Sequence, residues 1–247
     1  MSVALEVRKL RHKKVPGLVV GLAAFEGVWM IFTMVGGSKL PYALAESVDM
    51  FVMLMGLVAG LIAVQIVGVD RECRMGQWLS ARGRSPLRRF LHKIVLADVV
   101  VVVYHLALIG LVFAVAGPLG MESSPVVVSL VGPIALATVC GCLAVMPVQL
   151  ALAENLERPS TSVVIGIIAG MVSMALPFMN AKWVGWLFPW GLLTAANPVM
   201  PLTVENRAQP EIQLMAHTGA VLVAAAVMAI MWAVLAIGSV VRKENQR

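Results

Sequence analysis

Six long apolar runs divide the chain. They fall at about 16–35, 48–69, 94–117, 125–150, 162–179 and 216–241. Most of them reach the roughly 20 residues that an α-helix needs to cross the hydrocarbon core of a bilayer. Apolar and polar residues do not alternate within the runs, which argues against transmembrane β-strands. The pattern predicts an all-α polytopic membrane protein with six transmembrane helices in one domain, residues 1–247.

Composition supports this class. Hydrophobic residues make up 60% of the 247 residues and charged residues 13%, against about 25% charged residues in a soluble domain. That leaves too little polar surface to cover a water-facing globule, which argues against a soluble enzyme. Residues 1–14 are basic and precede an apolar run, as in a signal peptide. The run at 16–35 exceeds the roughly 7–15 residues usual there, so we interpret it as a retained first membrane helix.

Positive charge is distributed unevenly between the two sides of the predicted bundle. All but three of the 19 Lys and Arg residues fall on the side of the predicted bundle that carries both termini. Lys39, Lys182 and Arg207 fall on the other side. Positively charged loops remain in the cytoplasm, so both termini are predicted to be cytoplasmic. The same rule explains the net charge of +6 without a nucleic-acid partner.

Three further segments of the chain carry a pattern of their own. Residues 2–14 predict a short amphipathic helix on the inner membrane surface. Pro133 and Pro147 predict a kink or break in the fourth run. The outer connection at 180–215 contains four prolines and the tryptophans Trp183, Trp186 and Trp190 at helical spacing. Because tryptophan favours the membrane–water boundary, we expect short, broken interfacial helices there.

The largest predicted cytoplasmic piece, residues 70–93, has two interpretations. Its basic residues can simply set the topology and contact anionic lipid. Met75, Trp78 and Leu79, however, form a small apolar stripe at helical spacing, and Asp70 and Glu72 stand beside the arginines. An apolar anchor ringed by charges of both signs is typical of a protein interface. The second interpretation is therefore a docking helix for a soluble partner.

The sequence lacks the motifs of nucleotide and hydrolytic chemistry. It has no phosphate-binding loop of the Gly-x-x-x-x-Gly-Lys-Ser/Thr type, no Gly-x-Ser-x-Gly, no His-Glu-x-x-His and no Gly-x-Gly-x-x-Gly. The three cysteines and four histidines have no metal-ligand spacing. We therefore expect a chain that is not an enzyme and has no catalytic, cofactor or metal site of its own.

Ionisable residues within the runs are candidates for function, because a charge inside a membrane is costly. Glu26 and His105 each lie about eleven residues into their runs from the same side, about 16 Å deep at about 1.5 Å per residue. This equal depth motivates the hypothesis that they touch. Asp98, closer to the inner boundary, is expected to reach Lys93 or water. Together Glu26, Asp98 and His105 define an alternative function, an ion-coupled secondary transporter with a proton relay.

Three Gly-x-x-x-Gly pairs occur, at Gly17–Gly21, Gly56–Gly60 and Gly166–Gly170. Such pairs can let helices approach closely. Their number is little more than 21 glycines would give by chance, so we expect ordinary helix packing from them.

The order of these parts resembles the ABC-2 type permease subunits of ATP-binding cassette exporters. Those proteins have an inner amphipathic helix, six spans, a charged helix between the second and third spans, and a broken outer segment before the sixth. Glu72–Leu79, followed by Arg84-Ser85-Pro86 and Lys93, is similar to the first coupling-helix region of that family. Gln149–Glu157, Ser160–Gly170 and Phe188-Pro189-Trp190 are similar to the permeases of lantibiotic (bacteriocin) self-protection transporters.

The resemblance implies a partner and a location. A cytoplasmic ABC ATPase subunit would hold ATP and Mg²⁺, and a second permease copy or a related permease would pack alongside in the bacterial plasma membrane. The cargo would be amphipathic or hydrophobic, an antimicrobial peptide for instance; no cargo residue can be carried over. An intramembrane enzyme is disfavoured because no catalytic constellation is present. The residues implied in ATPase docking are Asp70, Arg71, Glu72, Met75, Trp78, Leu79 and Arg82, with a second contact at Glu154, Glu157 and Arg158.

Overall fold

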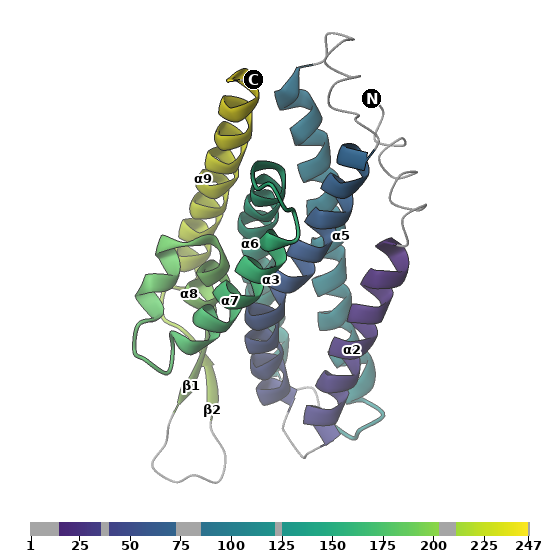
Figure 1. The fold of residues 1–247 in the computed structure, drawn as a ribbon. Helices are drawn as coiled ribbons and strands as arrows, with labels where there is room; N and C mark the ends of the chain where they lie inside the picture. Colours follow the sequence, from purple (N-terminus) through teal and green to yellow (C-terminus); the bar gives the residue numbers. More distant parts are fainter. Residues whose placement is uncertain (1–14, 36–39, 73–84, 122–124, 203–210, 247) are drawn as a thin grey trace.

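The computed structural model describes residues 15–35, 40–72, 85–121, 125–202 and 211–246, which form a bundle of apolar helices (Figure 1). Apart from one short hairpin and the connecting turns, the described chain is helical, with α-helices and two short 3-10 helices. The predicted coupling segment beyond Glu72 and the predicted amphipathic helix at 2–14 lie outside the described residues. The main helices are α2 (Val15–Val35), α3 (Leu40–Glu72), α5 (Pro86–Ala116), α6 (Pro125–Asn155), α7 (Thr161–Ala175) and α9 (Thr218–Asn245).

Four of the described helices are long and apolar enough to cross a membrane. The qualifying segments are Ala43–Arg71, Leu87–Ala116, Val127–Asn155 and Thr218–Lys243. The first and fifth predicted runs also form apolar helices, but their apolar parts are shorter, at Pro16–Phe32 and Thr161–Ala175. The helical, membrane-embedded class is confirmed, with four described helices that qualify as spans by length and composition. The count of six spans stays a prediction.

Several helices extend beyond the apolar runs that predicted them. α3 begins at Leu40, and α5 begins at Pro86 and includes the charged turn before Lys93. Ser85 starts α5 as its N-cap, because its hydroxyl accepts a hydrogen bond from the Arg88 amide at 3.4 Å and Pro86 follows at the first helical position. Of the kink or break predicted in the fourth run, the break is wrong, because α6 continues through Pro133 and Pro147. Prolines are tolerated in membrane helices because neighbouring groups satisfy the freed carbonyls.

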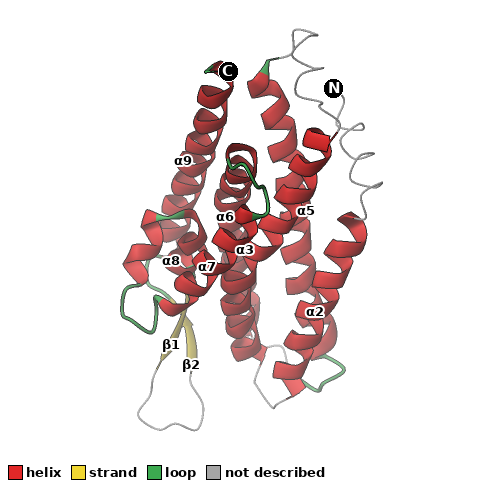
Figure 2. Cartoon of the chain, in the orientation of Figure 1, coloured by secondary structure: helices red, strands yellow, loops and turns green. Residues whose placement is uncertain are grey.

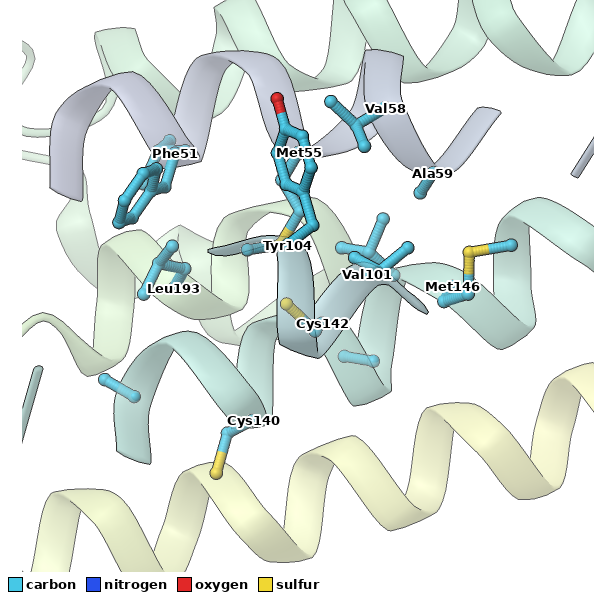
Figure 3. Packing of buried hydrophobic residues seen from close by; sticks show 14 of the residues in the cluster. Phe51, Met55, Val58, Ala59, Val101, Tyr104, Cys140, Cys142, Met146 and Leu193 are labelled. Carbon is cyan, nitrogen blue, oxygen red and sulfur yellow. The ribbon is translucent and has the colours of Figure 1, made fainter. Parts of the chain in front are cut away.

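The core of the bundle lies between α3, α5 and α6. Phe51 and Met55 of α3 pack with Val101 of α5 and Met146 of α6 (Figure 3). The outward faces are apolar too. On α9 they include Val223, Val227, Ile230 and Val234, all at least 60% exposed. A large apolar surface of this kind suits contact with lipid.

Two of the three Gly-x-x-x-Gly pairs pack against each other where α3 crosses α7. A methyl group added to Gly56 would overlap the Gly166 carbonyl, and one added to Gly60 would lie 2.9 Å from the Val163 Cα. Gly170 faces the Met53 carbonyl in the same way. The glycines thus set the backbone-to-backbone approach of the two helices. The expectation of ordinary packing from these pairs is therefore wrong. The third pair, Gly17–Gly21, has no neighbouring atom within 4 Å.

The outer connection after α7 is broken, as predicted, into short helices. They are η1 (Lys182–Leu187), η2 (Pro189–Gly191) and α8 (Leu192–Ala196). All five residues of α8 are buried, and α8 packs against α6, α3 and α9. Trp183 is 66% exposed, whereas Trp186 and Trp190 are partly buried against the core.

An antiparallel hairpin that was not predicted follows α8. It pairs β1 (Val199–Leu202) with β2 (Glu211–Leu214), in the register Val199 opposite Leu214 (Figure 2). The prediction of helices alone over 180–215 is corrected on this point.

Candidate functional site

The end of α6 is capped by an arginine from α3. The guanidinium of Arg71 donates to the carbonyl oxygens of Ala153 at 2.9 Å, Glu154 at 3.1 Å, Leu156 at 2.7 Å and Glu157 at 2.7 Å. The last carbonyls of a helix have no partner within the helix, and they carry its partial negative charge. The five donors of a guanidinium suit such a group of acceptors. Arg71 therefore joins two chain segments more than 80 residues apart.

A buried lysine lies next to this cap. The ammonium of Lys93, on α5, forms ion pairs with Asp70 of α3 at 2.6 Å and with Glu154 of α6. The three side chains are 10%, 16% and 23% exposed, respectively. One cation thus holds two carboxylates from two different helices in a poorly solvated place, where a charge without a partner is costly.

The C-terminal helix joins the same place. Lys243 of α9 donates to the Asn155 carbonyl, and the Asn155 amide donates to the Ser239 hydroxyl at 3.2 Å. α3, α5, α6 and α9 are therefore tied together at one end of the bundle, where the C-terminus also lies (Figure 1). We call this set the charged junction: Asp70, Arg71, Lys93, Glu154, Asn155 and Lys243.

The charged junction contains several of the residues predicted to dock a partner. Asp70, Arg71 and Glu154 belong to it, and Glu157 provides one of the carbonyls bound by Arg71. Arg158 follows in the exposed turn before α7. Glu72 is the last residue of α3. The remaining predicted docking residues lie outside the described residues: Met75, Trp78, Leu79 and Arg82.

Sequence reasoning missed the roles of Lys93, Asn155 and Lys243. Lys93 was expected to pair with Asp98 and belonged to the resemblance to coupling segments, but its pairing with Asp70 and Glu154 was not predicted. A lysine so close to a membrane segment is the signal that could have suggested a buried partner.

The predicted contact between Glu26 and His105 is not formed. Glu26 is 1% exposed, and its carboxyl lies beside the hydroxyl of Tyr104 instead. His105 is fully buried; its Nδ1 donates to the Val101 carbonyl at 2.8 Å, and its ring packs edge-on against Phe51 and Tyr104. Because a carbonyl only accepts, Nδ1 carries the proton, and Nε2 is a bare acceptor without a hydrogen-bond partner among the described residues.

Asp98 does not reach Lys93, which is held by Asp70 and Glu154. Its Oδ1 atom is buried and has no hydrogen-bond partner in the described part of the chain. The described His, Cys, Asp and Glu residues form no group of three or more that could hold a metal ion.

The opposite end of the bundle carries a separate lysine. Lys182 of η1 donates to the Asn197 carbonyl at 3.1 Å and contacts the Met215 sulfur at 3.7 Å. Burial lowers the pKa of the Lys182 ammonium from its ordinary value, and the nearby carboxylate of Asp49 partly opposes this shift. These contacts fasten the start of the broken segment to the base of the hairpin.

Replacing Arg71 tests its role as a cap. Arg71→Ala removes four charge-assisted hydrogen bonds and is expected to cost about 1–3 kcal/mol of unfolding free energy. Arg71→Lys keeps the charge but cannot span the four carbonyls, so it should recover only part of the loss. Amide hydrogen exchange at 153–158 in detergent should rise in the order wild type, lysine, alanine. Equal exchange in all three proteins would contradict the capping role.

Comparison with known proteins does not assign a family: no family model, curated protein or solved structure matches the chain.

Proposed function

We propose that this chain is the membrane-spanning permease subunit of an ATP-driven exporter of the ABC-2 type, with a cargo that is amphipathic or hydrophobic. In this proposal α2 and α7 are the first and fifth spans, and both termini lie in the cytoplasm of a bacterial cell. ATP is hydrolysed on a separate ATPase subunit, in keeping with the lack of a phosphate-binding loop in this sequence. A second permease, identical or related, completes the membrane part.

One observation carries the proposal: Arg71 fastens the base of the predicted coupling segment to the turn after α6. A subunit that pushes on the segment following Glu72 would therefore act on the end of α6 as well. Lys93 extends the connection to α5, and Lys243 extends it to α9. A motor that grips one end of the bundle needs such a rigid attachment.

The broken segment after α7 adds support for transport. Non-helical backbone at membrane depth is tolerated where protein buries it or where it lines a water-filled path. α8 is buried against α3 and α6, and a methyl group on Gly141 of α6 would lie 3.0 Å from the Leu193 Cβ. Discontinuous helices of this kind are frequent in transporters.

The exposed apolar faces support membrane insertion of the two shorter helices. Val20, Phe25 and Phe32 of α2 are at least 58% exposed, and Val164, Ile168 and Met171 of α7 at least 54%. Such surfaces are stable in lipid but not in water. The membrane lipids are thus direct partners of this chain.

Copurification from the native membrane tests the ATPase partner. Reversing the exposed charge with Arg158→Glu is expected to reduce the recovered ATPase several-fold, because the turn faces the proposed partner and charge reversal opposes docking. Trp78→Ala should act in the same direction by removing the apolar anchor. Arg242→Glu makes the same charge change at an exposed position of α9 and is the matched control.

Two outcomes would contradict the proposal. One is that ATPase recovery is equal in all three variants and in the unmodified chain. The other is that the purified chain alone, in vesicles without any ATPase, moves solute at the full rate in response to a proton gradient. The second outcome would favour the ion-coupled transporter instead.

A further inference from the structure

The carboxyl group of Glu26 is buried where α2 packs against α5, a helix interface that we call the seam. Both side-chain oxygens of Glu26 are buried and have no hydrogen-bond partner among the described residues. The neighbouring Gly27 packs so closely on α5 that an added methyl group would lie 2.9 Å from the Leu111 side chain. The two helices are therefore tightly packed at this level.

The groups that face Glu26 are few. Tyr104 of α5 is the titratable side chain beside it. The buried Tyr104 hydroxyl lies within interaction range of the carboxyl, without a hydrogen bond of ordinary geometry to a described residue. His105, next along α5, is turned toward Val101 and Phe51. α3, the other helix packed on α2, carries its charged residues toward its two ends, at Glu46, Asp49 and 70–72. No described cation faces the carboxyl.

This environment selects the protonated form of Glu26. An ionised carboxylate without a cation, in an apolar interior, costs several kcal/mol more than the neutral acid. A single phenol hydroxyl does not offset that cost. For the acid to ionise, water must reach the carboxyl, and the adjacent Tyr104 hydroxyl can then turn to donate a hydrogen bond to the carboxylate.

We propose that Glu26 and Tyr104 form a proton-binding site in the seam between α2 and α5. In the closed seam Glu26 carries the proton as a carboxylic acid. When water enters the seam, the O–H bond of Glu26 breaks, the proton passes to that water, and the carboxylate accepts a hydrogen bond from the neighbouring Tyr104. The site adds a proton-dependent step to the entry of water into this seam and does not depend on the proposed ATPase partner.

Carbodiimide labelling tests the site. Dicyclohexylcarbodiimide reacts with protonated carboxylic acids in apolar surroundings, and peptide mass spectrometry of the full-length chain in detergent locates the adduct. Glu26 should be labelled at mildly acidic pH. The amount of Glu26 adduct should fall about tenfold per pH unit once the acid ionises. The partly exposed Glu46 provides a second carboxyl adduct for comparison. Glu26→Gln should lose this adduct and keep the one on Glu46.

The Tyr104→Phe variant distinguishes a proton-binding site that includes Tyr104 from an acid that is only buried. Without the hydroxyl, the carboxylate loses its hydrogen-bond donor, so labelling of Glu26 should persist to higher pH than in the unmodified chain. Absence of an adduct on Glu26 in the folded chain would overturn the proposal. So would labelling of Glu26 with the same pH dependence in Tyr104→Phe and wild type. Because no ATPase is present, failure here is distinct from failure of the permease proposal.

Discussion

Replacing Lys93 with methionine is expected to lower the free energy of unfolding by about 3–5 kcal/mol, the usual cost of removing one partner from a buried ion pair. Methionine fills a similar volume but provides no charge. The carboxylates of Asp70 and Glu154 would then lie close to the same point without the ammonium that holds them together. Their repulsion would push apart the ends of α3 and α6, which Arg71 also joins.

A neutral triple variant isolates the electrostatic part of this effect. Asp70→Asn and Glu154→Gln, added to Lys93→Met, remove the two charges that Lys93 compensates, and most of the lost stability should return. The unfolding temperatures of the wild type, Lys93→Met and the triple variant are measured in mild detergent, with size-exclusion chromatography as the readout of the folded protein. If Lys93→Met alone unfolds at the same temperature as wild type, the charged junction does not hold these helices together.

The helical, membrane-embedded class was predictable because it depends on a local property. Twenty apolar residues in a row have few other stable solutions. The ends of the helices were less predictable, because charged turns such as the one before Lys93 continue a helix beyond its apolar run. Hydrophobicity marks the part of a helix that lipid can cover, and capping residues such as Ser85 decide where the helix begins.

The charged junction could not be predicted from spacing. Its ion pairs join residues on different helices, Lys93 to Asp70 and Lys93 to Glu154, and only tertiary packing brings them together. Sequence reasoning did select both carboxylates, through the resemblance to coupling segments. It assigned the lysine between them to Asp98, because Asp98 is close to Lys93 along the sequence, whereas the actual partners lie on α3 and α6.

Equal depth predicted the right level for Glu26 but the wrong neighbour. Depth along two antiparallel or parallel helices fixes the height of a side chain and not its direction around the axis. Consecutive residues of a helix point about 100° apart, so Tyr104 faces Glu26 while His105 faces Phe51. The hairpin was missed for a related reason: the alternating Glu211–Leu214 is a short strand signal, and its partner β1 contains a proline.

Placing leucine at Gly56 is expected to prevent α7 from seating on α3. The side chain would meet the Gly166 carbonyl and the Trp190 ring, which lies 3.0 Å from the first added carbon. Overfilling a packed core costs about 1–3 kcal/mol where side chains can shift, and here the obstacle is backbone, so the loss should reach or exceed the top of that range. Broken packing at this point would also displace η2 and α8.

Gly68 provides the matched control on the same helix. Nothing lies within 4 Å of a methyl group placed there, and leucine forms helices better than glycine by up to about 1 kcal/mol. Gly68→Leu should therefore unfold at or above the wild-type temperature, whereas Gly56→Leu should unfold well below it. Equal unfolding temperatures of the two variants in detergent would mean that the glycine crossing of α3 and α7 contributes little to the fold.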